Sequence, residues 1–174
     1  MSPIALPAAD EYAPYYGKYV ALVGPDLLAA LEAQARSTAA LLAATSEERG
    51  DHRYAEGKWC VKEVIGHLAD GERVFAYRAL RFARTDTTEL PGFDENVYVP
   101  AGRFDRRTLA SVAAEFAAVR TATLTLVRSF DEESLARRGS ANNTPVSVRG
   151  LVAIIAGHEA HHVKLLRERY GLTG

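Results

Sequence analysis

The sequence predicts an all-α protein, a four-helix bundle that forms a single domain over residues 1–174. Three observations predict this class. Apolar residues recur at spacings of three and four in four long segments, which is the period of an amphipathic helix. No segment gives a convincing strand, and polar or proline- and glycine-containing connections separate the helical segments. The length suits one domain with a substantial core and is short for two.

The first helix is expected after Pro25, over "DLLAALEAQARSTAALLAAT", ending near Thr45. Its apolar positions recur at helical spacing. They are Leu28, Leu31, Ala35, Ala39 and Leu42. One amphipathic helix therefore opens the bundle.

The second helix is expected to begin after Trp59 and to continue through "VKEVIGHLADGERVFAYRALRFAR". Cys60 takes the N-cap position, and Glu63 stands three residues later as the partner in a capping box. Gly71 interrupts the helix at about 1 kcal/mol relative to alanine, a cost usually tolerated where a backbone or ligand must come close. The buried stripe is predicted at Val61, Val64, Ile65, Leu68, Phe75 and Phe82.

A long connection, Asp86 to Arg107, shows no helical period and is expected to be a loop. Ordered loops of this length are often functional. The third helix is expected over residues 109–130, and the fourth from Ser147 as N-cap to Tyr170. The connection between them is polar. The long crossover between the second and third helices is the main irregularity of the predicted bundle.

Composition excludes several classes of function. With 48% hydrophobic and 25% charged residues, and no run near eighteen apolar residues, the chain is not expected to span a membrane. A net charge of −1 leaves no basic excess for nucleic acid. The N-terminal residues do not resemble a secretion signal, so a cytoplasmic location is expected. Cys60 is the only cysteine, so any metal site must be built mainly from His, Asp and Glu.

Three of the five histidines fall within five positions in "GHEAHHVKLL", residues 157–166. At about 100° per residue, His158 and His162 project within roughly 40° of each other, in line with apolar residues of the fourth helix. Both are therefore expected to point into the bundle. His67, on the flank of the second helix, is permitted but not required to reach the interior. An inward pair plus one histidine from a facing helix would supply three nitrogen ligands with open metal positions.

The alternative is that these are core or boundary histidines that hydrogen-bond to backbone carbonyls and neighbouring carboxylates. His161 lies about 60° to one side of His158 and could support a ligand or replace one. His52 has no partner in register and is expected at the surface. Spacing alone leaves the metal and core interpretations open.

The same residues match H-E-x-x-H, the helix motif of zinc proteases, at His158, Glu159 and His162. In the usual proteases of this type a third ligand lies downstream. Only twelve residues follow His162, and Glu168 is too close on the same helix. Glu159 projects about 100° from His158, towards the outer face, where it would merely be solvated. We therefore expect no peptidase activity.

The chain resembles the DinB/YfiT-like superfamily of bacterial metal-binding four-helix bundles, particularly its DinB-like subgroup. The resemblance covers most of the chain and is carried by "WCVKEVIGHLADGERVFAYRALRFAR", "LPGFDENVY" and "PVSVRGLVAIIAGHEAHHVKLL". It implies that His67 and the pair His158 and His162 bind a divalent metal, and it implies a homodimer. Cys60 departs from the family, in which serine or threonine usually follows the tryptophan. Characterised relatives include S-transferases that use bacillithiol or mycothiol and a mycothiol-dependent maleylpyruvate isomerase.

The leading hypothesis is a metal-dependent transferase that activates a low-molecular-weight thiol for attack on a small electrophilic substrate, with zinc, nickel or iron as the metal. Asp70, one turn from His67, could support a ligand or be solvated. Asp94 and Glu95 could cover the site or form a plain turn. Cys60 could have a lowered pKa if exposed, or be buried and inert. Metal-assisted hydrolysis and a non-catalytic metal- or small-molecule-binding module for a stress response are the alternatives.

Overall fold

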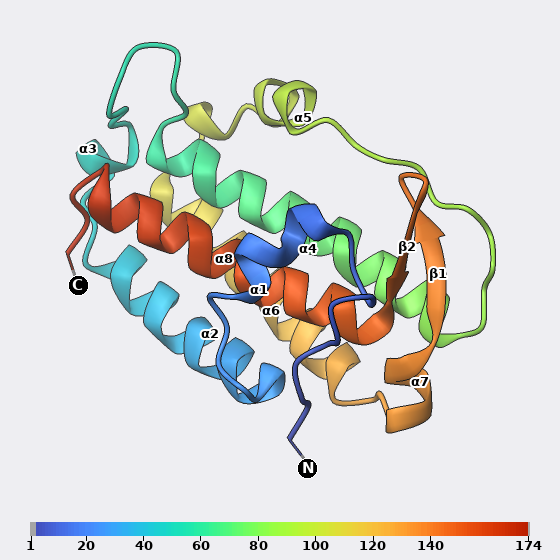
Figure 1. Ribbon diagram of the computed structural model, residues 1–174. Coiled ribbons are helices and arrows are strands. Elements are labelled where there is room, and N and C mark those ends of the chain that lie inside the picture. The colour runs from blue at the N-terminus through green and yellow to red at the C-terminus, as the bar shows by residue number, and fades with distance from the viewer. Residues whose placement is uncertain (1–2, 174) are drawn as a thin grey trace.

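Four long helices form the body of the protein in the computed structural model, which describes residues 3–173 (Figure 1). They are α2 (Leu27–Ala43), α4 (Val61–Ala83), α6 (Leu109–Val127) and α8 (Val148–Glu168). Around the bundle, α2 packs against α6 and α8, and α4 packs against the same two helices. The predicted four-helix bundle is confirmed, with helix ends that differ from the predicted ones by a few residues.

Side chains at the helix starts satisfy backbone N–H groups that have no partner inside the helix. Asp26 caps α2 by accepting from the N–H groups of the second and third helical residues. Ser147 caps α8 by accepting from Gly150 N at 2.8 Å. At α4 the Glu63 carboxylate accepts from the Cys60 N–H at 2.7 Å, as the capping box predicted. Local sequence therefore sets where these helices begin.

Short helices complete the chain around the bundle. Of these, α1 packs on α8, on the face drawn towards the viewer in Figure 1. The short elements are the 3-10 turns η1 (Pro14–Tyr16) and η2 (Phe104–Arg106), and the helices α1 (Gly17–Val20), α3 (Glu47–Gly50) and α7 (Glu132–Ala136).

The crossover between α4 and α6 is not the plain loop that was predicted, because it contains the helix α5 (Glu95–Gly102). Asp94 caps α5 by accepting from Asn96 N at 2.8 Å. The helix has eight residues and includes Pro100, so it is too short and too interrupted to show a hydrophobic period. In Figure 1 it lies beside the N-terminal half of α4, where it can reach the functional site.

The absence of strands was also a wrong prediction. A two-stranded antiparallel hairpin, β1 (Arg138–Ala141) and β2 (Thr144–Ser147), precedes α8. Its turn residues Asn142 and Asn143 have φ of 54° and 57°, the left-handed conformation that asparagine tolerates and tight hairpin turns require. The strands have four residues each and are largely polar, so they carry little hydrophobic alternation. Leu90 of the crossover pairs with Ala141, which ties the crossover to the hairpin.

Two apolar clusters fill the bundle, one toward each end. Along α4, residues 61–69 belong to one cluster and residues 75–83 to the other. Buried polar side chains lie between the clusters, and we call them the polar layer. The polar layer consists of Thr38, His67, Glu72, Arg120, His158, Glu159 and His162.

The helix α6 is long and apolar enough to cross a membrane by length and composition alone. The core helix of a globular protein can meet the same criterion. Here α6 packs against α2 and α4, and Arg120 near its middle is buried in the bundle. The large apolar residues of α6 therefore lie mainly on its buried face, and alanines supply much of the apolar character of its exposed face.

Candidate metal centre

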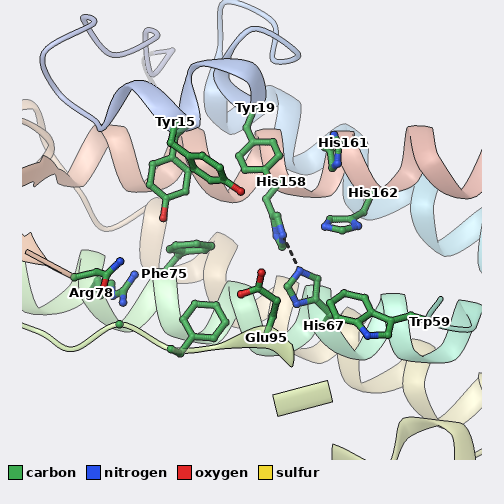
Figure 2. Close-up of a pocket in the computed structure, with 14 residues that line it drawn as sticks. Tyr15, Tyr19, Trp59, His67, Phe75, Arg78, Glu95, His158, His161 and His162 are labelled. Atoms are coloured by element: carbon green, nitrogen blue, oxygen red, sulfur yellow. Dashed lines mark hydrogen bonds between the residues drawn. The ribbon is translucent and has the colours of Figure 1, made fainter. Parts of the chain in front are cut away.

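Three histidines from two helices converge on one point (Figure 2). His67 comes from α4, and His158 and His162 come from α8, one helical turn apart. Their side chains are 6%, 8% and 9% exposed. One ring nitrogen of each lies within 4.8 Å of the others, and Nε2 of His67 is 3.0 Å from Nε2 of His158. His67 thus reaches the interior. The helical period of the sequence allowed this position for His67 but did not require it.

Gly71 makes room for this convergence. A Cβ atom at residue 71 would lie 3.2 Å from Cε1 of His158, tighter than an ordinary contact. The group that comes close to Gly71, as predicted, is therefore His158, a candidate metal-binding residue on the facing helix.

Burial keeps the three rings neutral. Desolvation lowers the pKa of His67 to about 4, although Glu95 raises it slightly. Desolvation, with repulsion from His67 and His161, lowers the pKa of His162 to about 3. The pKa of His158 falls well below its ordinary value for the same reasons. Near neutral pH each ring has a free lone pair, which is the form that binds a metal.

The arrangement fits a divalent transition metal. Metal–imidazole bonds of about 2.0–2.1 Å place adjacent ligand nitrogens roughly 3–3.5 Å apart, which matches the His67 to His158 distance. Nδ1 of His162 is buried and has no hydrogen-bond partner within residues 3–173. Imidazole donors without a carboxylate suit zinc, nickel and iron. One shared cation could therefore satisfy all three rings.

The histidines form one wall of a cavity of about 310 Å³. Three parts of the chain that are distant in sequence enclose it: the N-terminal segment, α4 and the crossover (Figure 2). Most of the enclosing side chains are aromatic. The other lining residues are Tyr15, Tyr16, Tyr19, Trp59, Phe75, Arg78, Gly92, Phe93, Glu95, Asn142 and His161. A metal held by the three histidines would face space for a small molecule.

Two of the remaining candidate residues lie at this cavity. Glu95, at the start of α5, lines it, while Asp94 is occupied as the cap of that helix. His161 also lines it, with its ring centre 5.2 Å from that of Tyr19. Both residues can touch a bound molecule without being part of the three-histidine cluster.

The other candidates lie elsewhere. Asp70 is 3.4 Å from Arg73 and, among the described residues, forms no hydrogen bond with the three histidines. Cys60 is buried, and burial raises the pKa of its thiol, so it is not a reactive thiolate. His52 is half-buried rather than fully at the surface, and its ring faces Tyr170 outside the cavity.

Glu159 is the clearest correction. It was expected on the outer face, but it is 1% exposed. Its carboxylate lies 2.6 Å from Nη1 of Arg120 on α6 and accepts from the Thr38 hydroxyl at 2.5 Å. The helix α8 is buried on nearly all sides over residues 150–159. A side chain that projects 100° away from His158 therefore enters another part of the interior and not the solvent. It points away from the cavity and cannot act there as a general base.

The aromatic walls and Arg78 were not predicted. The N-terminal stretch "APYYGKYV" contains three tyrosines that line the cavity, and this clustering was a usable signal. No sequence signal identified Arg78 as a cavity residue. The helix α4 and its end carry four arginines between residues 73 and 84, and the sequence does not distinguish them.

Comparison with known proteins agrees with this architecture. A family model described as the DinB superfamily matches residues 30–166. Among solved structures, YfiT from Bacillus subtilis superposes with a TM-score of 0.69 and 15% sequence identity, covering 97% of this chain and 95% of its own. It is described as a probable metal-dependent hydrolase with an unusual four-helix bundle topology. At this identity the match shows the fold. No functionally curated protein matches the chain.

Proposed function

The chain belongs to the DinB superfamily, and from this premise we propose that it is a divalent-metal-dependent enzyme that activates a low-molecular-weight thiol for transfer to a small electrophile. His67, His158 and His162 are the proposed ligands. One observation carries the proposal: three neutral imidazoles meet at the wall of a cavity large enough for a small molecule.

Three neutral ligands leave the full charge of a dication in place. A metal at this position would lower the pKa of a thiol that enters the cavity, so that a thiolate is available at neutral pH. An anion is matched to this charge better than a neutral molecule.

The surrounding residues have roles of their own in this proposal. The Glu95 carboxylate is exposed at the cavity and can accept the proton that the thiol releases. Burial raises the pKa of Tyr19, which therefore remains a phenol that can donate a hydrogen bond. The aromatic walls take the apolar part of the substrate and exclude water.

Metal-assisted hydrolysis is the second candidate, with water in place of the thiol. Two observations favour it. A carboxylate beside a metal site can act as general base toward water, which is the position of Glu95. YfiT, which shares the fold, is described as a probable metal-dependent hydrolase.

The metal site is tested first by elemental analysis. The purified protein should hold close to one divalent metal per chain, and His162→Ala should lose most of it. His52→Ala is the matched control, because that histidine lies outside the cavity, and it should keep the metal. Full metal content in His162→Ala would refute the site.

Thiol activation is tested on cobalt-substituted protein. Bacillithiol, or a simpler aminothiol, should produce a sulfur-to-metal charge-transfer band that is absent from His67→Ala. The same thiol should accelerate consumption of a model electrophile only when metal is present. An unchanged spectrum at millimolar thiol would refute the transferase. Metal-dependent ester or amide cleavage without thiol would then establish the hydrolase, and inactivity in both assays would indicate a binding module.

A further inference from the structure

Arg78 is a buried cation to which no carboxylate in the described part of the chain is paired. Its residue exposure is 5%, and within residues 3–173 it forms no ion pair. Its Nη2 donates a hydrogen bond to the carbonyl of Pro91, at 2.6 Å. Arg120, which is 2% exposed, pairs with both Glu72 and Glu159. Carboxylates therefore balance the charge of Arg120, whereas no carboxylate within residues 3–173 forms an ion pair with Arg78.

A largely buried charge without a counterion is less well solvated than one in bulk water, and the Arg78 nitrogens other than Nη2 are open to the cavity rather than enclosed by protein. Desolvation lowers the pKa of Arg78 accordingly, with weaker opposing effects from Tyr16 and Glu89. Glu89 does not neutralise it, since the Glu89 carboxylate accepts from the Asn143 N–H and lies beyond ion-pair distance of Arg78. The remaining N–H donors of the guanidinium have no partner in the described part of the chain, and Arg78 lines the cavity.

Arg78 lies at the opposite end of this cavity from the three histidines (Figure 2). It follows His67 by eleven residues on α4, which is about 16 Å along a helix axis. The Phe75 ring bridges the interval. Its centre is 5.7 Å from the guanidinium carbon and 6.1 Å from the ring centre of His158. Phe75 therefore lies between the two ends, where a ligand that reaches both would contact it.

At the Arg78 end of the cavity, the crossover and the β1–β2 hairpin are in contact. Leu90 donates to the Ser140 carbonyl at 3.0 Å and accepts from the Asn142 N–H at 2.9 Å, so the crossover is joined to the hairpin. A Cβ atom at Gly92 would lie 2.4 Å from Oδ1 of Asn142, so the two segments are in close contact. The segment that carries Pro91, the hydrogen-bond partner of Arg78, is therefore joined to the hairpin.

We propose that Arg78 forms an anion-binding subsite that takes the carboxylate of a small substrate with an aromatic or apolar body. This inference rests on the proposed function, because it places the reactive part of that substrate at the three histidines. A guanidinium with free donors pairs best with a planar anion that has two oxygens. Phe75, Tyr16 and Phe93 supply an apolar surface for the body of the molecule.

The test measures binding and needs no turnover. The probes are 3-phenylpropionate and its uncharged amide, which have the same shape. Both are titrated calorimetrically into the metal-loaded protein and into protein treated with a chelator, because a carboxylate can also bind a metal. The carboxylate should bind at least about tenfold more tightly than the amide, as expected for a charge-assisted pair. The preference should remain after the metal is removed.

Arg78→Gln should abolish this preference, and Arg78→Lys should retain part of it because it keeps the charge. Arg73→Gln is the matched control, since Arg73 lies on the same helix outside this cavity and pairs with Glu115. It should leave both affinities unchanged. Thermal unfolding shows whether each variant is folded. If Arg78→Gln is not folded, an undiminished preference in Arg78→Lys would overturn the inference, because lysine lacks the paired donors of a guanidinium.

Three outcomes would overturn the inference: a preference that persists in Arg78→Gln, a preference that disappears when only the metal is removed, or no measurable binding of the carboxylate to the intact protein. Failure of the proposed function looks different. In that case thiols leave the cobalt spectrum unchanged, while the Arg78-dependent preference for the carboxylate remains.

Discussion

His158 and Glu159 are neighbours in the sequence, and the structure gives them separate roles. The histidine faces α4 and the cavity, whereas the glutamate faces Arg120 and Thr38. Successive residues on a helix project about 100° apart, so adjacent side chains on a fully buried helix enter different surroundings. The H-E-x-x-H pattern is therefore present in the sequence, but its glutamate is part of the bundle interior.

Glu159→Gln should consequently leave metal content unchanged and lower the stability of the fold. The change removes one charge from a buried ion pair, although Arg120 keeps its pair with Glu72. A loss of roughly 1–3 kcal/mol is expected for a buried polar partner that is no longer matched. Urea unfolding measures the loss, and elemental analysis measures the metal. A zinc-dependent peptidase activity that disappears in this variant would contradict both the geometry and the expectation of no peptidase.

At the scale of elements, the cavity depends on how α1 sits on α8. Gly157 of α8 allows this contact, because a Cβ atom there would lie 2.3 Å from the Tyr19 carbonyl oxygen. The clashing atom belongs to the backbone of Tyr19, so the clash cannot be relieved by rotating a side chain. The position of α1, and with it the three tyrosines that enclose the cavity, therefore depends on the absence of a side chain at residue 157.

Gly157→Ala should displace α1 and expose the N-terminal segment. Lys18 is exposed on α1, and trypsin cleavage after it should become faster than in the unaltered protein. Gly24→Ala is the matched control, because nothing lies within 4 Å of a Cβ atom there, and its cleavage rate should not change. Equal cleavage rates in all three proteins would show that α1 does not depend on this contact.

The elements that the sequence predicted are those with a long hydrophobic period. The second and fourth predicted helices have Cys60 and Ser147 as their N-caps, as expected, because a capping residue and an apolar stripe coincide there. The helix α5 and the β1–β2 hairpin were missed, since eight residues or fewer carry too little periodicity. Their stability comes from caps, turn conformations and pairing with distant segments such as Leu90.

At the scale of the whole molecule, the candidate site lies where the polar layer separates the two apolar clusters. The inward pair His158 and His162 could be predicted from one helix, because both residues share its period. His67 needed either the facing helix or the family resemblance. Arg78 needed the tertiary structure, because only packing shows which arginine of α4 is buried without a counterion.

The three buried histidines also couple the stability of the metal-free fold to pH. In the unfolded chain their pKa is near 6.5, whereas in the folded protein that of His67 is about 4 and that of His162 about 3. At pH values between the folded and unfolded pKa values, the histidines of the unfolded chain bind more protons than those of the folded protein. The free energy of unfolding must therefore fall as the pH falls, by up to about 1.4 kcal/mol per pH unit for each histidine.

Chelator-treated protein should consequently lose stability from about pH 6.5 downward, well above the pH at which ordinary carboxylates titrate. Urea unfolding at several values between pH 7 and pH 5 measures this slope. His162→Ala should reduce the slope by removing one contributor. Metal-loaded protein should be more stable near pH 7, because the metal binds the folded state, and this advantage should shrink as protons compete for the rings. A metal-free protein whose stability is constant from pH 7 to pH 5 would show that the rings are not buried in the neutral form.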